Sequence, residues 1–416
     1  MSTRPLSIAM VAPCPFPTPQ GTQVFISGLA RALHRRGHRV DLVTYHYGQE
    51  GAGDIDGPGL HRSRPLPVRG KLTSGPSLKK PLFDLLLAAR LDQVVRGSGA
   101  DLIHAHNYEG LLIGLLIGRR RHIPVIFHSH NTMTDELPSY SRSRFGRNIS
   151  RSLGNLLDGR FPRRAQACIA VTPQIAEEVR QRGMPPDLIC AIPPAVDKVR
   201  WPEATRPRAP AEPPAVLYAG NLDSYQNLDL VVGSFQRVLD RHPGVRLQIV
   251  THAPADKTTR AVRRWKIHRG IEIIRAGSFE EMWRHLQRCR VALCPRISPY
   301  GFPIKLLNYL AAGKPVVICR SSAQGIEHLE NGWVVEDDDR AGFAEAILAL
   351  LEDETLCRRL SEGARRTIRE RYSWETLIPR YETVYGKVLD RWNKEKSDPR
   401  NGSPSHRSSR SSGRPS

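Results

Sequence analysis

The sequence predicts an α/β protein made of two doubly wound, Rossmann-like domains that face one another across a cleft. The chain has 416 residues, and single hydrophobic cores stop growing at about 250–300 residues, so two domains are the default. Short apolar runs alternate with amphipathic stretches along both halves, a pattern typical of parallel sheets covered by helices. The alternation stops in the proline-rich segment 199–214, which has the composition of a linker, and then restarts.

The first domain is expected to span residues 1–198 and to begin with a strand–loop–helix–strand unit. Residues 7–13 form an apolar run, residues 23–36 carry apolar side chains at helical spacing, and residues 39–45 form the next apolar run. Residues 46–80 are basic and glycine-rich and are expected to form a loop. Further strands are expected at 101–105, 124–129, 167–172 and 188–192, and further helices at 82–97, 109–118 and 174–182.

The second domain is expected to span residues 215–373. Its strands are expected at 215–219, 246–250, 272–275, 291–294 and 315–319, and its helices at 227–241, 279–289, 303–312, 340–352 and 354–369. An amphipathic helix over 374–393 is expected to pack back on the first domain. Residues 394–416 are mostly Ser, Arg, Pro and Gly, and we expect them to be a disordered basic tail. Ligands of such sheets bind outside the carboxyl ends of the strands, which places the site in the cleft.

The net charge is strongly positive. Lys and Arg number 62 and Asp and Glu 41, which gives +21. Such a charge attracts phosphate-rich partners, namely an anionic membrane surface, nucleic acid or a phosphorylated substrate. An arginine-rich composition with a basic tail would give the same charge without any such partner. The basic side chains that could dock on anionic lipid headgroups lie in the loop 61–80 and are Arg62, Arg64, Arg69, Lys71, Lys79 and Lys80.

Several classes of protein are disfavoured. The seven cysteines are scattered without a C-x-x-C pair, which favours a reducing compartment. The first residues lack the long apolar segment of a signal peptide, and the most apolar stretch, 111–118, is far shorter than the ~20 residues that span a bilayer. We therefore expect a cytoplasmic protein, soluble or peripheral at the inner face of the membrane. A Gly-Lys-Ser/Thr phosphate loop and a recognised RNA or DNA module are both missing, so nucleic acid is not an expected partner.

The densest group of candidate site residues lies in residues 294–317. A strand ends there, a glycine-containing loop follows, and a helix is expected to begin near Pro303, because proline is tolerated in a first turn. The free N–H groups of a helix start form an anion site, to which Lys305 would add a formal charge. Asn308, three residues further on the same face, could hydrogen-bond a ribose or sugar hydroxyl. An ordinary strand-to-helix junction with Lys305 in water fits the same pattern.

This segment resembles the donor-binding element of family-4 glycosyltransferases of the GT-B fold, and the resemblance extends over roughly residues 7–390. The family pattern is Glu-Gly-Phe-x-x-x-x-x-Glu followed by Gly-x-Pro-Val-Val. Gly301, Phe302 and residues 313–317 match this pattern. The resemblance implies that the first domain faces the acceptor and that the second binds a nucleotide sugar.

The chain departs from the family at both glutamates, whose positions hold Tyr300 and Asn308. Asn308 could keep a neutral version of the ribose contact that the second glutamate makes. The sequence from Pro303 to Lys305 resembles a divergent subgroup with Pro-x-Lys at the helix start. The residues that the resemblance implies for donor binding are Gly21, Thr22, Gly220, Asn221, Gly277, Tyr300, Gly301, Phe302, Pro303, Ile304 and Asn308.

The resemblance implies catalytic roles for His130, Lys305 and Arg296. Family members place a histidine at the position of His130, where it contacts the sugar near the reacting carbon. The family often carries Arg and Lys near Asn221 and Gln226, so Lys305 and Arg296 are expected to supply the missing positive charge. His104 and His106, and likewise His128 and His130, follow a His-x-His spacing, but no carboxylate or cysteine has a spacing that fits a third metal ligand.

The resemblance implies transfer of a sugar from a nucleoside diphosphate, UDP or GDP, to a hydroxyl acceptor with retention of configuration, in glycan, polysaccharide or glycolipid biosynthesis. We find no side chain that must act as a covalent nucleophile. Residues 337–339 are three aspartates interpreted as a helix start, so neither Mg²⁺ nor a further cofactor is expected. A lipid-linked acceptor is our hypothesis. The alternatives are a catalytically silent GT-B protein, a nucleotide-sugar epimerase of the related type, and a nucleic-acid-binding protein.

Overall fold

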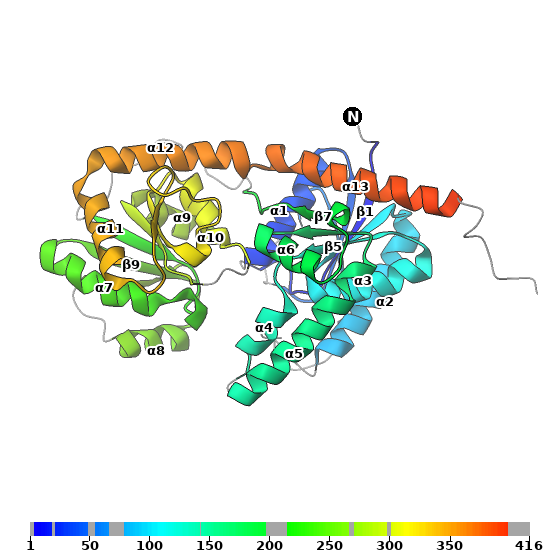
Figure 1. Cartoon of the computed structure of the whole chain (residues 1–416), viewed down its shortest axis with the longest axis horizontal. Coiled ribbons are helices and arrows are strands. Elements are labelled where there is room, and N and C mark those ends of the chain that lie inside the picture. Colours follow the sequence, from blue (N-terminus) through cyan, green and yellow to red (C-terminus); the bar gives the residue numbers. More distant parts are fainter. Residues whose placement is uncertain are drawn as a thin grey trace, which may run out of the picture.

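The structure is a computed structural model, and it describes residues 4–18, 21–48, 55–65, 79–141, 143–196, 214–265, 270–297 and 301–397. It consists of two α/β domains, each built on a parallel sheet with helices on its faces (Figure 1). The predicted fold class is therefore confirmed. In Figure 1 the domains lie side by side, and the long helices α12 and α13 run along one side of the pair.

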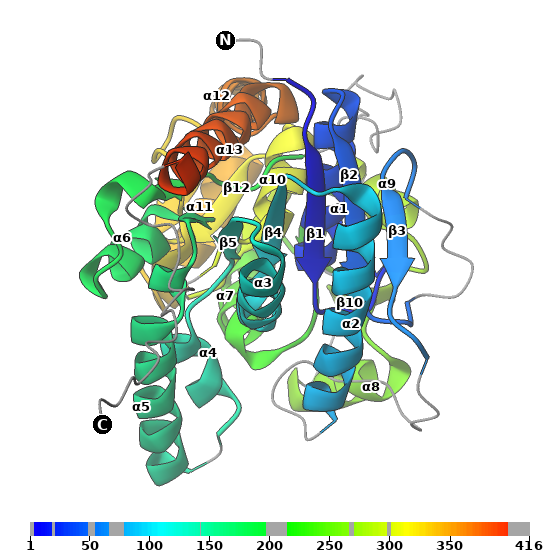
Figure 2. The ribbon, with the colours of Figure 1, turned by 90° about the vertical axis from the view of Figure 1, so that its right-hand side faces the viewer.

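The first domain contains a seven-stranded sheet in the order β3-β2-β1-β4-β5-β6-β7. All of its neighbouring strands run parallel, so their carboxyl ends share one edge (Figure 2). The strands are β1 Ser7–Ala12, β2 Arg39–Thr44, β3 Gly59–Arg62, β4 Leu102–His106, β5 Val125–Ser129, β6 Ala167–Ala170 and β7 Ile189–Ala191. The helices are α1 Gly21–Arg35, α2 Lys80–Ser98, α3 Asn107–Arg121, α4 Met133–Ser139, α5 Arg144–Arg160 and α6 Pro173–Gln181, with a short 3-10 turn, η1, at Pro162–Arg164.

The second domain contains a six-stranded parallel sheet in the order β10-β9-β8-β11-β12-β13. The strands are β8 Ala215–Ala219, β9 Arg246–Thr251, β10 Ile271–Arg275, β11 Val291–Cys294, β12 Val316–Cys319 and β13 Trp333–Val335. The helices are α7 Leu228–Arg241, α8 Ala255–Trp265, α9 Phe279–Arg288, α10 Ile304–Ala311, α11 Arg340–Glu352 and α12 Glu354–Arg371. Its central strands are fully buried, as expected for strands covered on both faces.

Helix α13, Trp374–Ser397, follows α12 of the second domain but packs on the first (Figure 1). Tyr381 and Tyr385 are fully buried in the core that also contains Ile26 and Leu29 of α1. The carboxylate of Glu382, buried in the same contact, accepts hydrogen bonds from the Arg36 guanidinium at 3.0 and 3.1 Å. The first domain is therefore completed by a helix that follows the second domain in the chain.

The structure corrects two sequence expectations. The segment 46–80, expected as a loop, contains β3 and the start of α2. Strand β3 has the sequence GLHR and is only partly buried, so it carries too little apolar signal to be predicted. The tail, expected to be disordered from residue 394, is helical as far as Ser397, and the rest of it lies outside the described residues. Helices α4, α5 and α8 and strand β13 were not predicted.

Candidate active site between the two domains

The predicted site residues come together because each follows a strand at the carboxyl edge of a sheet. His130 directly follows β5, and Gly220 directly follows β8. A Cβ atom added to Gly301 would lie 3.3 Å from the backbone oxygen of His130. A Cβ atom added to Gly21 would lie 3.2 Å from Cγ1 of Ile304. The first and second domains therefore touch at residues that the sequence had assigned to one site.

The N-termini of two helices meet at this contact. Helix α1 begins at Gly21 and Thr22, and α10 begins at Ile304 after Pro303, which stands at the N-cap position rather than in the first turn. The first N–H groups of a helix have no partner within the helix, and the helix dipole adds partial positive charge there. Two such ends side by side form an environment suited to an anion such as a diphosphate.

Lys305 lies in the first turn of α10 and is held by three contacts. Its Nζ donates a hydrogen bond to the Tyr218 hydroxyl at 2.9 Å and another to the side-chain oxygen of Gln226. The same nitrogen lies 4.2 Å from the centre of the Tyr218 ring. Burial lowers the pKa of Lys305 to about 8, with a smaller contribution from the nearby charge of Arg296. Lys305 is therefore an oriented, desolvated cation whose ammonium form a bound anion would stabilise.

A position that lies close to the Lys305 head group in space, Gly220, requires a glycine. Gly220 adopts a positive φ of 156°, which L-amino acids with a side chain rarely adopt. A Cβ atom there would lie 3.1 Å from Nζ of Lys305 and 2.8 Å from the Tyr218 hydroxyl. That hydroxyl in turn donates to the backbone oxygen of Asn221 at 2.7 Å. The turn after β8 therefore leaves space for the lysine head group.

Arg296 follows β11 and supplies the second predicted positive charge. Its guanidinium carbon lies 5.7 Å from the centre of the Tyr225 ring, and the Tyr225 hydroxyl accepts a hydrogen bond from the Asn221 side chain at 2.8 Å. Burial lowers the pKa of Arg296, although arginine stays charged in proteins. Arg296 is also close enough to Lys305 to lower the pKa of that residue. The two cations repel each other, and an anion bound beside them would relieve the repulsion.

His130 ends a cluster of four histidines on β4 and β5. Its Nε2 lies 3.2 Å from Nδ1 of His106, and its ring stacks on His128 with 4.8 Å between ring centres. Nε2 of His104 lies 2.9 Å from Nδ1 of His128, and Nδ1 of His104 lies 2.7 Å from the hydroxyl of Tyr385 on α13. Burial lowers the pKa of His130 to about 3. His130 is therefore neutral near pH 7 and can donate or accept a hydrogen bond without carrying charge.

The histidine cluster also contains the group of described residues that comes nearest to a metal-binding arrangement. One ring nitrogen each of His104, His106 and His128 lies within 4.8 Å of the others. Zn²⁺ binds imidazole nitrogens at about 2.0–2.1 Å, so tetrahedral ligand atoms lie about 3.4 Å apart, whereas Nε2 of His104 and Nδ1 of His128 lie at the hydrogen-bond distance of 2.9 Å. The mutual hydrogen bond of His104 and His128 accounts for two of the three side chains without an ion.

The three aspartates at 337–339 act as structural groups. Asp337 accepts a hydrogen bond from the backbone N–H of Ser321 at 3.1 Å, and Asp338 accepts one from Asn227 at 3.0 Å. Asp339 caps α11 by accepting from the backbone N–H of Gly342 at 2.9 Å. The interpretation of this run as a helix start is therefore confirmed.

The remaining predicted residues differ in what they contact. Phe302 is buried and packs on Tyr372, with ring centres 5.6 Å apart, so its side chain belongs to the core of the second domain. Asn308 is half-buried on α10, three residues after Lys305. Gly277 lies after the edge strand β10, where its N–H donates to the Glu281 carboxylate at 2.7 Å. Tyr300 lies outside the described residues.

Sequence reasoning missed the residues that orient the predicted ones. Tyr218 and Gln226 hold Lys305 but lie 87 and 79 residues away from it in the chain. Phe25 of α1 contacts the His130 ring edge-on, with ring centres 5.3 Å apart. Each of these pairs joins distant parts of the sequence, so no local sequence pattern predicts the contact. The one available signal was the position of Tyr218 in the last residues of a strand, two residues before Gly220.

Comparison with protein families identifies the class of the chain. Residues 19–200 match the family model described as Glycosyltransferase Family 4, and residues 213–353 match the model described as Glycosyl transferases group 1. The two matches correspond to the two domains of the structure. The chain therefore belongs to the glycosyltransferases of the GT-B fold.

Individual relatives cover different shares of the chain. Phosphatidyl-myo-inositol mannosyltransferase of Mycobacterium tuberculosis is 24% identical over 400 residues, which are 92% of this chain and 98% of the relative. Exopolysaccharide phosphotransferase SCO2592 of Streptomyces coelicolor is 28% identical over 233 residues, which are 55% of this chain and only 23% of the relative. The crystal structure of Anabaena Alr3699/HepE with UDP and glucose superimposes with a TM-score of 0.67 at 14% identity, covering 93% of this chain and 99% of that one.

Proposed function

We propose that this protein is a retaining glycosyltransferase that moves a sugar from a nucleoside diphosphate, UDP or GDP, to a hydroxyl acceptor without a metal ion. The observation that carries the proposal is the position of Lys305, a half-buried cation at a helix N-terminus, beside Arg296 and the start of α1. The family matches and the UDP complex of a protein with the same fold support this donor class.

The chemical obstacle in this reaction is negative charge that builds up on the departing diphosphate. Fixed donors aimed at that charge, in a site with little water, stabilise the transition state more than the ground state. Lys305, Arg296 and the first N–H groups of α1 and α10 are such donors. They replace the divalent cation that would otherwise neutralise the diphosphate.

The proposed step conserves every atom and charge without a protein nucleophile. The bond between the anomeric carbon and the diphosphate oxygen breaks, and a bond from the acceptor oxygen forms on the same face of the sugar. The acceptor proton passes to an oxygen of the leaving phosphate. His130, neutral because its pKa is lowered to about 3 by burial, donates a hydrogen bond to a sugar hydroxyl near the reacting carbon.

We further propose that the acceptor is membrane-bound and that the protein works at the cytoplasmic face of an anionic membrane. Helix α5 carries an apolar stripe at helical spacing, Phe145, Ile149, Leu153 and Leu156, of which Phe145 is 76% and Leu156 64% exposed. The same helix carries Arg144, Arg147, Arg151 and Arg160. An exposed apolar stripe beside basic side chains is the signature of a helix that lies in a lipid interface.

The position of α5 fits this role. Helices α4 and α5 project from the first domain (Figure 1), and α4 begins three residues after His130. The Asp158 carboxylate of α5 accepts hydrogen bonds from the backbone N–H groups of Met133 and Thr134 at 3.1 and 2.8 Å. Helix α5 is therefore fixed to the segment that carries His130.

The basic side chains of the loop 61–80 are less suited to contact with lipid than those of α5. Lys80 is paired with Glu109 at 2.5 Å, and Arg69 and Lys71 lie outside the described residues. Within the part of the chain that the structure describes, no helix combines the length and the apolar character needed to cross a bilayer. The contact that we propose is with the membrane surface.

Isothermal titration with UDP, GDP, ADP and CMP tests the donor site. We expect one nucleoside diphosphate to bind and to bind more weakly to Lys305→Met, which keeps the side-chain volume and removes the charge. NMR of the product's anomeric proton tests retention. Failure of every nucleotide to bind would favour a catalytically silent protein, for which the replacement of both family glutamates by Tyr300 and Asn308 gives the reason.

A further inference from the structure

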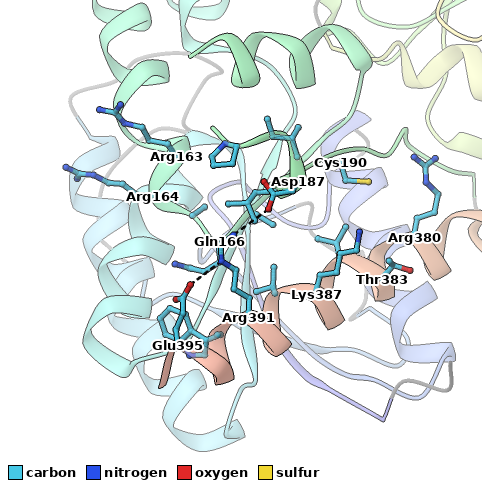
Figure 3. A pocket seen from close by; sticks show the side chains of 18 residues that line it. Arg163, Arg164, Gln166, Asp187, Cys190, Arg380, Thr383, Lys387, Arg391 and Glu395 are labelled. Atoms are coloured by element: carbon cyan, nitrogen blue, oxygen red, sulfur yellow. Dashed lines mark hydrogen bonds and ion pairs between the residues drawn. The ribbon is translucent and has the colours of Figure 1, made fainter. Parts of the chain in front are cut away.

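A cavity of about 500 Å³ lies on the first domain, between α13 and the β6–β7 edge of the sheet (Figure 3). Its walls come from three segments that are distant in the sequence, namely residues 163–167, residues 185–190 and residues 380–395. None of the residues assigned to the donor site lines it. Its volume falls within the ~300–1,000 Å³ of ordinary small-molecule sites.

The rim of the cavity is rich in positive charge. Five of its residues are basic, namely Arg163, Arg164, Arg380, Lys387 and Arg391, and two are acidic, Asp187 and Glu395. Figure 3 shows Lys387 and Arg391 rising from α13 toward the cavity, with Arg163 and Arg164 on one side and Arg380 on the other. The lining therefore has a net charge of about +3, which favours an anionic ligand.

The two acidic residues of the lining form ion pairs with only one of these basic residues, Arg391. Arg391 lies 3.6 Å from the Asp187 carboxylate and 3.1 Å from that of Glu395, and Arg380 donates to the backbone oxygen of Ala191 at 2.6 Å. Arg163 and Lys387 form no hydrogen bond or ion pair with any residue that the structure describes. Lys387, which rises from α13 toward the cavity, thus remains available to an oxyanion.

The floor of the cavity is apolar. It is formed by Leu188, Ile189, Val384 and Val388, with the indole of Trp392 beside them. The indole N–H of Trp392 is shielded from solvent and has no acceptor within the described residues, whereas buried donors are nearly always paired. A ligand with an apolar body and a polar oxygen next to it would satisfy both the floor and this N–H.

We propose that this cavity binds a phosphate-bearing amphiphile. Its phosphate is held by Lys387, because a cationic side chain forms strong, charge-assisted hydrogen bonds to phosphate. Its apolar body lies on the floor between β7 and α13. The proposal goes beyond the glycosyltransferase function and does not depend on it, since the cavity lies apart from Lys305 and His130.

Cys190 gives a direct readout of occupancy. It lines the cavity and is half-buried, whereas the other six cysteines are buried. Mass spectrometry measures the rate at which iodoacetamide alkylates Cys190 in the full chain. The probe is dioctanoyl phosphatidic acid, used below its critical micelle concentration. When the lipid concentration is ten times its Kd, about one protein molecule in eleven has no lipid bound. The alkylation rate of Cys190 should then fall about tenfold. Dioctanoylglycerol, which has the same chains without phosphate, should leave the rate unchanged.

Matched charge reversals on α13 separate a specific site from general attraction. Lys387→Glu should raise the lipid concentration that halves the alkylation rate of Cys190 by about tenfold or more. This is the effect of losing one charge-assisted hydrogen bond. Lys394→Glu makes the same change on an exposed residue of the same helix outside the cavity and should leave protection intact.

Several results would overturn the proposal. Equal protection by dioctanoylglycerol would show that phosphate plays no part, and equal protection by inorganic phosphate would show that the apolar floor plays none. Protection by vesicles of long-chain phosphatidic acid but not by the monomeric lipid would show contact with a bilayer surface instead of a cavity ligand. Unchanged alkylation with every probe would show that the cavity stays empty.

Discussion

The charge of Lys305 should contribute more to nucleotide affinity than any other single group of the proposed donor site. Lys305→Met removes that charge while Tyr218 and Gln226 keep their places. A hydrogen bond to a charged group contributes about 1.5–3 kcal/mol, so the Kd for the preferred nucleoside diphosphate should rise roughly 10- to 150-fold. Isothermal titration measures the change.

Lys314→Met is the matched control. Lys314 is a second half-buried lysine of the same domain, and its Nζ donates to the backbone oxygens of Gln287 and Cys289 at 2.7 and 2.8 Å. It contacts no residue of the proposed site, so its loss should lower stability without changing the Kd. A similar loss of affinity in both variants would point to damaged packing and would refute a specific role for Lys305.

The pH dependence tests the same reasoning. The pKa of Lys305 is lowered to about 8 by burial, so the free protein carries this charge below about pH 8 and loses it above. Affinity for the diphosphate should therefore fall as the pH rises through 8, and Lys305→Met should abolish that dependence. The unfolded chain holds the proton more tightly between about pH 8 and 10.5, so this residue's contribution to the free energy of unfolding increases with pH across that window. A wild-type affinity that stays flat through pH 8 would contradict the assignment.

Three further predictions follow from other parts of the structure. His106→Gln should lower kcat severalfold with little change in KM, because His106 positions the His130 ring; a change in KM alone would contradict this role. Phe145→Ser combined with Leu156→Ser should reduce sedimentation with anionic vesicles while nucleotide affinity, measured by titration, stays constant; undiminished sedimentation would exclude α5 as the contact. Glu382→Gln should lower the free energy of unfolding by about 1–2 kcal/mol in urea denaturation, since this buried carboxylate accepts two hydrogen bonds from Arg36; an unchanged midpoint would show that the contact of α13 with the first domain does not depend on this pair.

The sequence predicted the elements whose burial leaves a simple pattern. The run AVLYA became β8, which is buried at every position, because a parallel strand covered on both faces needs a continuous apolar run. Strand β3 and helix α5 escaped prediction for the opposite reason. The first is a short, partly exposed edge strand, and the second directs several large apolar side chains toward solvent.

The candidate site shows a similar division. His130 and Gly301 could be predicted from the resemblance to a known family, and Lys305 from its place in the first turn of an expected helix, where anions bind. The residues that contact and orient them could not be predicted, because tertiary packing decides which side chains meet in the interior. Tyr385, for example, reaches His104 from a helix 281 residues later in the chain, and Gln226 comes to Lys305 from the loop before α7.

The path of α13 has a consequence for the order in which the protein is made. Within the described residues, the strands and helices of the second domain are all in place by Arg371, whereas the core of the first domain still lacks Tyr381 and Tyr385 at that point. Domains generally fold as units during synthesis, beginning with the N-terminal one. Here the nascent first domain must wait, with the α1 surface that α13 covers open to the surroundings, until α13 has left the ribosome. A chain broken off after α12 would thus end with a complete second domain and an incomplete first one.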